Sequence, residues 1–265
     1  MRIAIYQGPA GPGSSEHNLR RLGHWAAEAA RQGAHLVVFQ EMFLSGYNIG
    51  ASAAQALAQP PDGELPEAVA SIARAQGIAI AYGYPEASEH GAVYNAAQLV
   101  DAQGQRLLDY RKAHLFGALD RAMFSPGDGG FAVVQLHGWS LGLLICYDVE
   151  FPEAVRQLAL AGAELVLVPT ANMAGFEFVA QVTVRARAYE NGCYLAYANY
   201  CGVEADLHYC GLSSLSGPAG EIVAAAQAQA KECLLVADLD RNHLAKLRAS
   251  TPYLQDRRPD LYDHP

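Results

Sequence analysis

Three reactive side chains stand directly after apolar, strand-like segments of this chain. Cys146 follows an apolar run and begins a polar turn, after which Pro152 can occupy the first position of a helix, where a missing N–H costs nothing. Glu41 ends one such segment, and Lys112 ends another in a basic loop. In open α/β sheets, functional groups gather at the carboxyl ends of strands, so we expect Glu41, Lys112 and Cys146 to converge on one crevice.

These residue types are the ones that a thiol needs to hydrolyse an amide. Cys146 would supply the thiol, and a helix N-terminus after it would lower the thiol pKa. Glu41 would take the thiol proton, protonate the departing ammonia and activate water, because burial raises the pKa of a carboxyl group. Lys112 and the backbone N–H of Tyr147 would stabilise the tetrahedral oxyanion.

Each of these residues also has an ordinary structural interpretation. A free cysteine is often buried as a small apolar side chain. Glu41 could cap a helix or stand in a turn, and Lys112 could be a surface lysine beside Arg111. Position after a strand favours the catalytic interpretation only when the three residues are taken together.

Four groups of motifs give the chain a specific resemblance. Taken together they resemble the nitrilase, or carbon-nitrogen hydrolase, superfamily over nearly the whole chain, and Glu, Lys and Cys occur in the order of that family. Residues 42–50, 146–153 and 193–202 resemble more narrowly the 5-aminopentanamidases of bacterial lysine breakdown. The four groups are Gln40–Tyr47; Tyr110–Lys112 with His114; Cys146–Asp148 with Phe151–Glu153; and Gly211–Ser213 with Gly217–Gly220.

The resemblance implies a cysteine acyl-enzyme and a Glu-Lys-Cys triad of Glu41, Lys112 and Cys146. The family often carries a second glutamate ahead of a Pro-Gly, and counting back from Pro126 places Asp120 there, with a side chain one methylene shorter. The resemblance also implies a homodimer or higher homo-oligomer, and no metal or other cofactor is expected.

Further residues are candidates for supporting or substrate-binding roles. His114 is either a hydrogen-bond partner behind the site or a loop histidine. Tyr47, Asn172 and Glu150 are expected to bind substrate. A carboxylate at Glu150 would select an ammonium group on the substrate by charge-assisted hydrogen bonding, although it could equally serve the N-terminus of the following helix.

The leading functional hypothesis is a thiol amidase that hydrolyses 5-aminopentanamide to 5-aminopentanoate and ammonia. An N-carbamoyl amine amidase, of the N-carbamoylputrescine type, would use the same residues on a ureido group. A nitrilase usually follows its cysteine with Trp-Glu, whereas this chain has Tyr147 and Asp148. A non-catalytic binding subunit would be expected to lack a triad member, and this chain has all three.

Composition limits the classes of protein further. The chain has 265 residues, 51% hydrophobic and 17% charged, enough to bury one large core, so we expect a single domain over residues 1–265 with residues 251–265 packing on it or on a partner subunit. The net charge of −9 argues against nucleic acid and membrane surfaces. Five cysteines without a Cys-x-x-Cys pair and a start without a signal-peptide pattern predict a cytoplasmic protein.

Hydrophobic periodicity predicts alternating helices and strands, with hairpins in the middle of the chain. This inventory fits an α/β fold with two mixed sheets packed face to face, each covered by helices, which is the nitrilase-like four-layer α-β-β-α sandwich. We expect helices over residues 15–32, 66–76, 151–161 and 178–190, and strands over residues 1–6, 35–39, 78–84, 93–100, 106–110, 131–136, 140–145, 165–169, 193–199, 211–216, 221–225 and 232–239.

Overall fold

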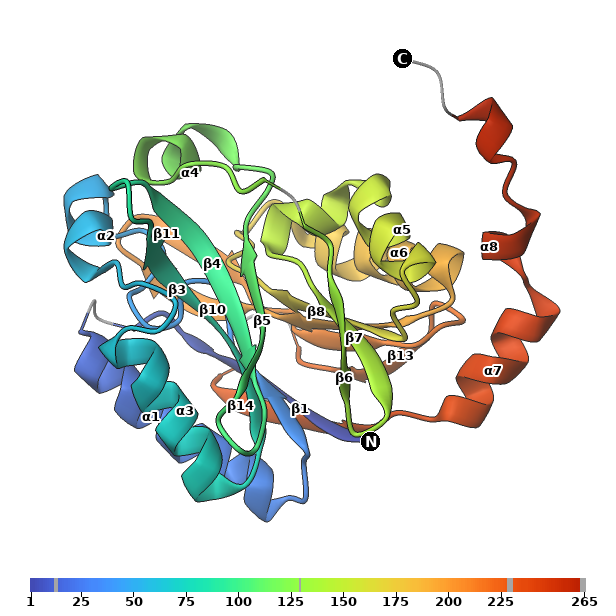
Figure 1. The fold of residues 1–265 in the computed structure, drawn as a ribbon, viewed down its shortest axis with the longest axis horizontal. Coiled ribbons are helices and arrows are strands. Elements are labelled where there is room, and N and C mark those ends of the chain that lie inside the picture. The colour runs from blue at the N-terminus through green and yellow to red at the C-terminus, as the bar shows by residue number, and fades with distance from the viewer. Residues whose placement is uncertain (12–13, 129, 228–230, 263–265) are drawn as a thin grey trace.

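Two β-sheets pack face to face in the computed structural model, and helices cover the outer face of each (Figure 1). The structure describes residues 1–11, 14–128, 130–227 and 231–262. Both sheets combine parallel and antiparallel strand pairs. The predicted four-layer α-β-β-α sandwich of two mixed sheets is therefore confirmed.

The first sheet has eight strands, in the order β11, β10, β1, β2, β3, β4 and β5, with β14 also paired to β1. The strand β1 pairs in parallel with β2 and antiparallel with β14. The bounds are β1 (Arg2–Pro9), β2 (Leu36–Val38), β3 (Ala79–Ala87), β4 (Val93–Val100), β5 (Arg106–Arg111), β10 (Tyr200–Glu204), β11 (Leu207–Cys210) and β14 (Cys233–Asp238).

The second sheet has six strands, in the order β13, β12, β9, β8, β7 and β6. Its centre is parallel, because β7, β8 and β9 run in the same direction, and both edges are antiparallel. The bounds are β6 (Val133–Leu136), β7 (Trp139–Leu143), β8 (Leu165–Pro169), β9 (Tyr194–Ala198), β12 (Ser214–Ser216) and β13 (Ile222–Ala225).

The helices that cover the sheets follow from capping and amphipathic sequence. In α1 (Ser15–Arg31), the side chain of Ser14 accepts a hydrogen bond from the backbone N–H of His17, as an N-cap residue does. α1 and α3 (Glu64–Gln76) pack on each other and cover the first sheet, whereas α5 (Pro152–Leu160) and α6 (Val184–Asn191) cover the second. Pro152 occupies the start of α5 as predicted.

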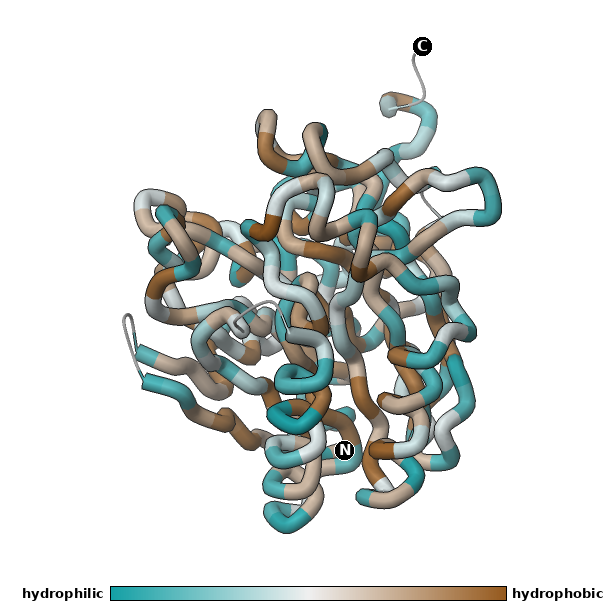
Figure 2. The backbone as a smooth tube through the Cα atoms, turned by 90° about the vertical axis from the view of Figure 1, so that its left-hand side faces the viewer, coloured by the Kyte–Doolittle hydropathy of each residue, from teal (hydrophilic) through white to brown (hydrophobic). Residues whose placement is uncertain are grey.

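The period-two alternation of β1 divides the apolar residues between two cores. Ile3 and Ile5 face the space between the sheets, and they belong to one cluster that includes β8 of the second sheet and the helix α5 that covers it. Ala4 and Tyr6 face the other way, toward Leu22 and other apolar residues of α1 and α3. Hydrophilic segments, teal in Figure 2, lie mainly at the periphery of the molecule.

The predicted helices and strands are present, but several elements were not predicted. The helix expected over residues 178–190 begins with a π-helical segment, Val179–Thr183, that leads into α6. The short helices α2 (Ala51–Leu57) and α4 (Gly117–Met123) lack a side-chain N-cap, so they carry little local signal. The hairpin of β10 and β11 and the helix α7 (Arg241–Ser250) were also missed.

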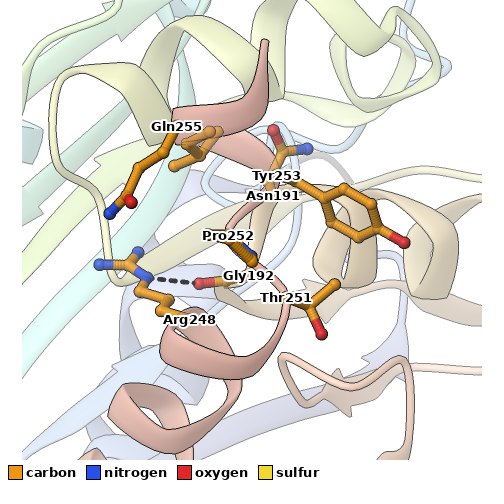
Figure 3. Close-up of a pocket in the computed structure, with 8 residues that line it drawn as sticks. Asn191, Gly192, Arg248, Thr251, Pro252, Tyr253 and Gln255 are labelled. Carbon is orange, nitrogen blue, oxygen red and sulfur yellow. Dashed lines mark hydrogen bonds between the residues drawn. The ribbon is translucent and has the colours of Figure 1, made fainter.

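The C-terminal segment leaves α7 and runs along the side of the molecule (Figure 1) as α8 (Tyr253–Asp256) and a 3-10 turn (Pro259–Leu261). Tyr253 packs edge-on against Tyr189 of α6, with ring centroids 5.6 Å apart. Figure 3 shows the pocket between this segment and the end of α6, where Arg248 Nε donates to the Gly192 carbonyl at 2.8 Å. Residues 263–265 of the predicted tail lie outside the described residues.

Candidate active site

Cys146 begins a sharp turn at the carboxyl end of β7. Its φ is +45°, a left-handed conformation that is uncommon for a residue with a Cβ atom. The chain then forms a 3-10 helix, Cys146–Glu150, before α5 begins at Pro152. A strained residue of this kind is held by its surroundings and is enriched at functional sites. The predicted strand, turn and helix around Cys146 are therefore present.

Glu41 and Lys112 form a buried ion pair. Glu41 lies in the turn after β2, Lys112 follows β5, and Lys112 Nζ lies 2.7 Å from Glu41 Oε1, with both side chains 0% exposed. Asn95 Nδ2 donates to the same oxygen at 2.7 Å. The hydroxyl of Tyr200 donates to the Glu41 carbonyl at 2.9 Å and so holds the backbone of the turn.

Asp120 completes the ion pair as a second carboxylate. It lies on α4, and its Oδ2 accepts from Lys112 Nζ at 2.7 Å and from the backbone N–H of Phe116 at 2.8 Å. Its Oδ1 accepts from the hydroxyl of Tyr47 at 2.7 Å. The aspartate therefore reaches Lys112 directly.

The pKa values of the buried groups shift in directions that suit proton transfer. Burial raises the pKa of Glu41, and the nearby Lys112 offsets only part of the effect. Burial alone would lower the pKa of Lys112, but Glu41 and Asp120 raise it above its ordinary value, so the lysine stays cationic. Burial and the charge of Glu41 also raise the pKa of the Cys146 thiol.

The raised thiol pKa contradicts the expectation that a helix N-terminus lowers it. The helix that follows Cys146 directly is a 3-10 helix of five residues, and α5 begins six positions later. Burial is the largest influence on the thiol. The resting thiol is therefore protonated and needs a base. Among the described residues, Glu41 Oε2 is buried and has no hydrogen-bond partner, so it is free to accept that proton.

A narrow pocket opens above Cys146. Predicted residues Tyr47, Tyr147, Glu150 and Asn172 line it with Cys146, and its other lining residues are Phe116, Ala171, Met173 and Phe176. Phe116 packs edge-on against Tyr147 and against Phe176, with ring centroids 5.3 and 5.6 Å apart. The structure therefore brings together all the residues predicted to bind substrate, in a largely aromatic setting.

Two of the pocket residues already use their polar groups inside the protein. The hydroxyl of Tyr47 donates to Asp120, so its ring is the part left for a substrate. Asn172 Nδ2 donates to the Phe176 carbonyl at 3.1 Å, which holds the loop that carries Phe176. Glu150 is half-buried, and burial raises the pKa of its carboxyl group while Lys112 and Arg187 lower it. Glu150 is thus the acidic group on the pocket wall.

His114 lies behind the pocket and not in it. Its Nδ1 lies 2.8 Å from Asp148 Oδ1, and its ring stacks on Phe151 at a centroid distance of 3.9 Å. The hydrogen bond to Asp148 raises the pKa of His114. Of the two interpretations of His114 from the sequence, the structure supports the hydrogen-bond partner.

Sequence reasoning assigned no role in the site to three residues that contact these groups. Asn95 was a visible signal, because it is an amide in the otherwise apolar strand β4. Asp148 is 0% exposed, which no local pattern showed. The Ala171 backbone N–H lies against the Cys146 thiol and opposes the rise of its pKa, and a backbone contact from the loop after β8 has no sequence signal.

No cluster of three or more metal-ligating side chains occurs in the part of the chain that the structure describes. In the same residues, no helix is long and apolar enough to cross a membrane.

The carbon-nitrogen hydrolase family matches residues 2–249. The chain therefore belongs to the carbon-nitrogen hydrolases of the nitrilase superfamily, and it is an enzyme of the amidase kind. A Pseudomonas protegens protein described as a hydrolase in the pqqF 5' region is 57% identical over 99% of this chain and 91% of its own length. An (R)-stereoselective amidase of a Pseudomonas species is 36% identical, over 97% of this chain and 92% of its own.

The fold also matches a solved amidase. The NitN amidase of Nesterenkonia sp. AN1 superposes with a TM-score of 0.86 and 38% identity, over 99% of this chain and 98% of that one. A variant of that amidase with a cysteine replaced by alanine has been solved in complex with butyramide. A variant with a glutamate replaced by glutamine has been solved with the acetamide moiety of fluoroacetamide added covalently to the active-site cysteine.

Proposed function

We propose that this enzyme hydrolyses small aliphatic amides through an acyl-enzyme on Cys146. The observation that carries the proposal is the strained Cys146 turn beside a buried carboxylate, Glu41, that has one oxygen without a partner. The covalent adduct on the active-site cysteine of the related Nesterenkonia amidase supports it.

The first half of the reaction would make a thioester. Glu41 takes the proton of Cys146 as the sulfur attacks the amide carbonyl carbon. The carbonyl oxygen becomes an oxyanion, which Lys112 Nζ and the N–H of Tyr147 stabilise. The C–N bond then breaks, and the proton held by Glu41 passes to the nitrogen, so ammonia leaves.

The second half would release the acid. Glu41 takes a proton from water as the water oxygen attacks the thioester carbon, and the C–S bond breaks when the proton returns to the sulfur. Asp120 also holds Lys112 in place, with its Oδ2 at 2.7 Å from Lys112 Nζ. Since it makes the same contact to the lysine as Glu41 does, we assign it the supporting role of the family's second glutamate.

The test of the nucleophile is the Cys146→Ala variant with a matched control, Cys233→Ala. Both cysteine residues are partly buried, but Cys233 lies on β14, outside the pocket. We expect Cys146→Ala to abolish ammonia release from butyramide and Cys233→Ala to keep it. Mass spectrometry of the wild type with fluoroacetamide should place the adduct on the Cys146 peptide. An adduct on any other cysteine contradicts the assignment.

We further propose that the preferred substrate is 5-aminopentanamide, an amide with an ammonium group at its far end. Glu150 is a carboxyl group on the pocket wall, and the rings of Phe116 and Phe176 offer faces that attract a cation. Lysine breakdown in the cytoplasm would supply such a substrate.

The test compares 5-aminopentanamide with neutral pentanamide in the Glu150→Gln variant. A charge-assisted hydrogen bond contributes about 1.5 to 3 kcal/mol, so we expect kcat/KM for the cationic amide to fall by about tenfold to a hundredfold, with little change for pentanamide. Glu153→Gln is the control, because Glu153 lies in the first turn of α5 and outside the pocket. An equal loss for both amides rejects Glu150 as the selector.

A further inference from the structure

Asp148 joins the two loops that carry the proposed catalytic groups. Its Oδ2 accepts from the hydroxyl of Tyr110 at 3.0 Å and from the backbone N–H of Ile145 at 3.2 Å. Its Oδ1 accepts from both the backbone N–H and Nδ1 of His114, at 2.9 and 2.8 Å. One carboxylate, 0% exposed, thus receives four hydrogen bonds from two separate segments.

The positions of these donors in the chain indicate what the contacts do. Tyr110 and His114 lie on either side of Lys112, and Ile145 and Asp148 lie on either side of Cys146. We propose that Asp148 is a positioning residue that holds the Cys146 turn against the loop that carries Lys112. It does so from behind the pocket, whose lining does not include it.

The strain at Cys146 explains why such a clamp is needed. A positive φ at a residue with a Cβ atom costs on the order of 1 to 3 kcal/mol, so the turn must be held by contacts around it. Asp148 accepts a hydrogen bond from the backbone N–H of Ile145, the residue directly before the strained Cys146, and so stabilises the turn. Its other bonds then fix this turn relative to β5, the strand that precedes Lys112.

A carboxylate suits this place better than an amide. All four partners are donors, and a carboxylate accepts with both of its oxygens. An asparagine would turn an NH₂ group toward either the Ile145 N–H or the His114 N–H, and that backbone donor would be left buried and unpaired. Phe151 stacks on the His114 ring and holds it toward Asp148. The raised pKa of His114 shows that the carboxylate favours the charged ring.

The inference rests on the proposed function, because it assumes that Cys146 and Lys112 act on the same substrate. The experiment is Asp148→Asn, with kcat and KM measured on butyramide well below the melting temperature and divided by the fraction of Cys146 that fluoroacetamide labels. We expect kcat to fall by about tenfold to a hundredfold, as misplacement of reacting groups by up to about 1 Å does, with KM changed much less. The pKa of His114, followed by NMR, should fall toward its ordinary value.

Two further variants make the result decisive. The Asp240 side chain caps the N-terminus of α7 and accepts hydrogen bonds from the N–H groups of Asn242 and His243. Asp240→Ala removes this cap, so it should lower the melting temperature while kcat stays unchanged. Tyr110→Phe removes one of the four bonds and leaves both loops in place, so it tests the clamp if Asp148→Asn does not fold. We expect a smaller loss of kcat from it, about threefold to tenfold.

The outcomes separate this inference from the proposed function. Normal kcat per labelled site in Asp148→Asn, or in Tyr110→Phe if the first variant does not fold, overturns the positioning role even when Cys146→Ala is inactive. Activity in Cys146→Ala overturns the proposed function itself. A loss of kcat in Asp240→Ala equal to that in Asp148→Asn also rejects the clamp, because general loss of stability then accounts for both.

Discussion

At the scale of single residues, the site is a small set of charges kept away from water. Lys112 stands between Glu41 and Asp120, and all three side chains are 0% exposed. Removing Lys112 from such a set would leave buried carboxylates without their counter-charge, and breaking a buried ion pair in this way typically costs about 3 to 5 kcal/mol. Tyr47 and Asn95 spread part of the negative charge through hydrogen bonds to the two carboxylates. The arrangement lets Glu41 change its protonation state while Lys112 keeps its charge.

The raised pKa of Glu41 predicts how kcat/KM depends on pH in acidic solution. Glu41 must be ionised to take the thiol proton, and burial places the pKa of its carboxyl group above the ordinary 4.5. We therefore expect kcat/KM for butyramide to rise with pH through an apparent pKa above that of a free glutamate, and to fall again only in more alkaline solution.

The matched measurement is the same profile for Glu41→Gln. An amide cannot titrate, so the remaining activity should be low and should lack this acid limb. A profile for Glu41→Gln that keeps the wild-type limb would assign that limb to another group.

At the scale of elements, the position of Glu41 depends on how closely the backbone of its turn approaches the backbone of β3. Gly83 on β3 faces the Glu41 turn, and a Cβ atom at Gly83 would lie only 2.3 Å from Met42 N and 2.8 Å from Gln40 O. Hydrogen bonds from the Gly83 N–H to the Gln40 carbonyl and from the Leu44 N–H to the Gly83 carbonyl join the turn to the strand. The absence of a side chain at position 83 therefore sets how close Glu41 stands to the sheet.

This contact predicts the effect of Gly83→Ala. The new methyl group clashes with backbone atoms of the Glu41 turn, and these cannot move aside as the end of a flexible side chain can. We expect a loss of about 1 to 3 kcal/mol in the free energy of unfolding, measured by urea denaturation, together with a lower kcat because the Glu41 turn is displaced.

Gly23→Ala is the matched control for the same substitution. Gly23 lies inside α1, where a Cβ atom would meet Ile72 at an ordinary 3.7 Å. Alanine has the higher helix propensity, so we expect this variant to gain up to about 1 kcal/mol in stability and to keep its kcat. Equal losses in the two variants would contradict the role given to Gly83.

At the scale of the whole molecule, large apolar side chains are exposed on α6 and the C-terminal segment, away from the active-site pocket. Tyr189 of α6 and Tyr253 of α8 are 41% and 40% exposed, and Leu261 and Tyr262 beyond them are 55% and 58% exposed. Large apolar side chains grouped in this way often mark a protein interface. We infer that residues 251–262 pack partly on the domain and partly on a second copy of the chain.

The inference predicts a homodimer in solution. Light scattering coupled to size-exclusion chromatography should give about twice the chain mass of 28.3 kDa at micromolar concentrations. Deleting residues 251–265 should shift the mass toward that of one chain. A monomer for the full chain over that range would reject the inference.

Local sequence determined most of the elements, and together with the family resemblance it predicted which groups react. The periodicity of α1, the unbroken apolar run of β8 and the hairpin of β4 and β5 are properties of short segments, and the structure has them nearly as predicted. Glu41, Lys112 and Cys146 were predicted as the reactive groups because each follows such a segment and because the three occur in the order of the nitrilase family.

Only the tertiary structure decided how these groups meet and what state they are in. The raised thiol pKa of Cys146 comes from burial and from Glu41, 105 positions away in the chain, and no local pattern reports the burial of a turn. The four donors on Asp148 and the amide of Asn95 on Glu41 likewise come from separate segments. Hydrogen bonding and desolvation depend on which side chains the folded sheets bring within about 3 Å of each other, and that distance is unrelated to separation along the chain.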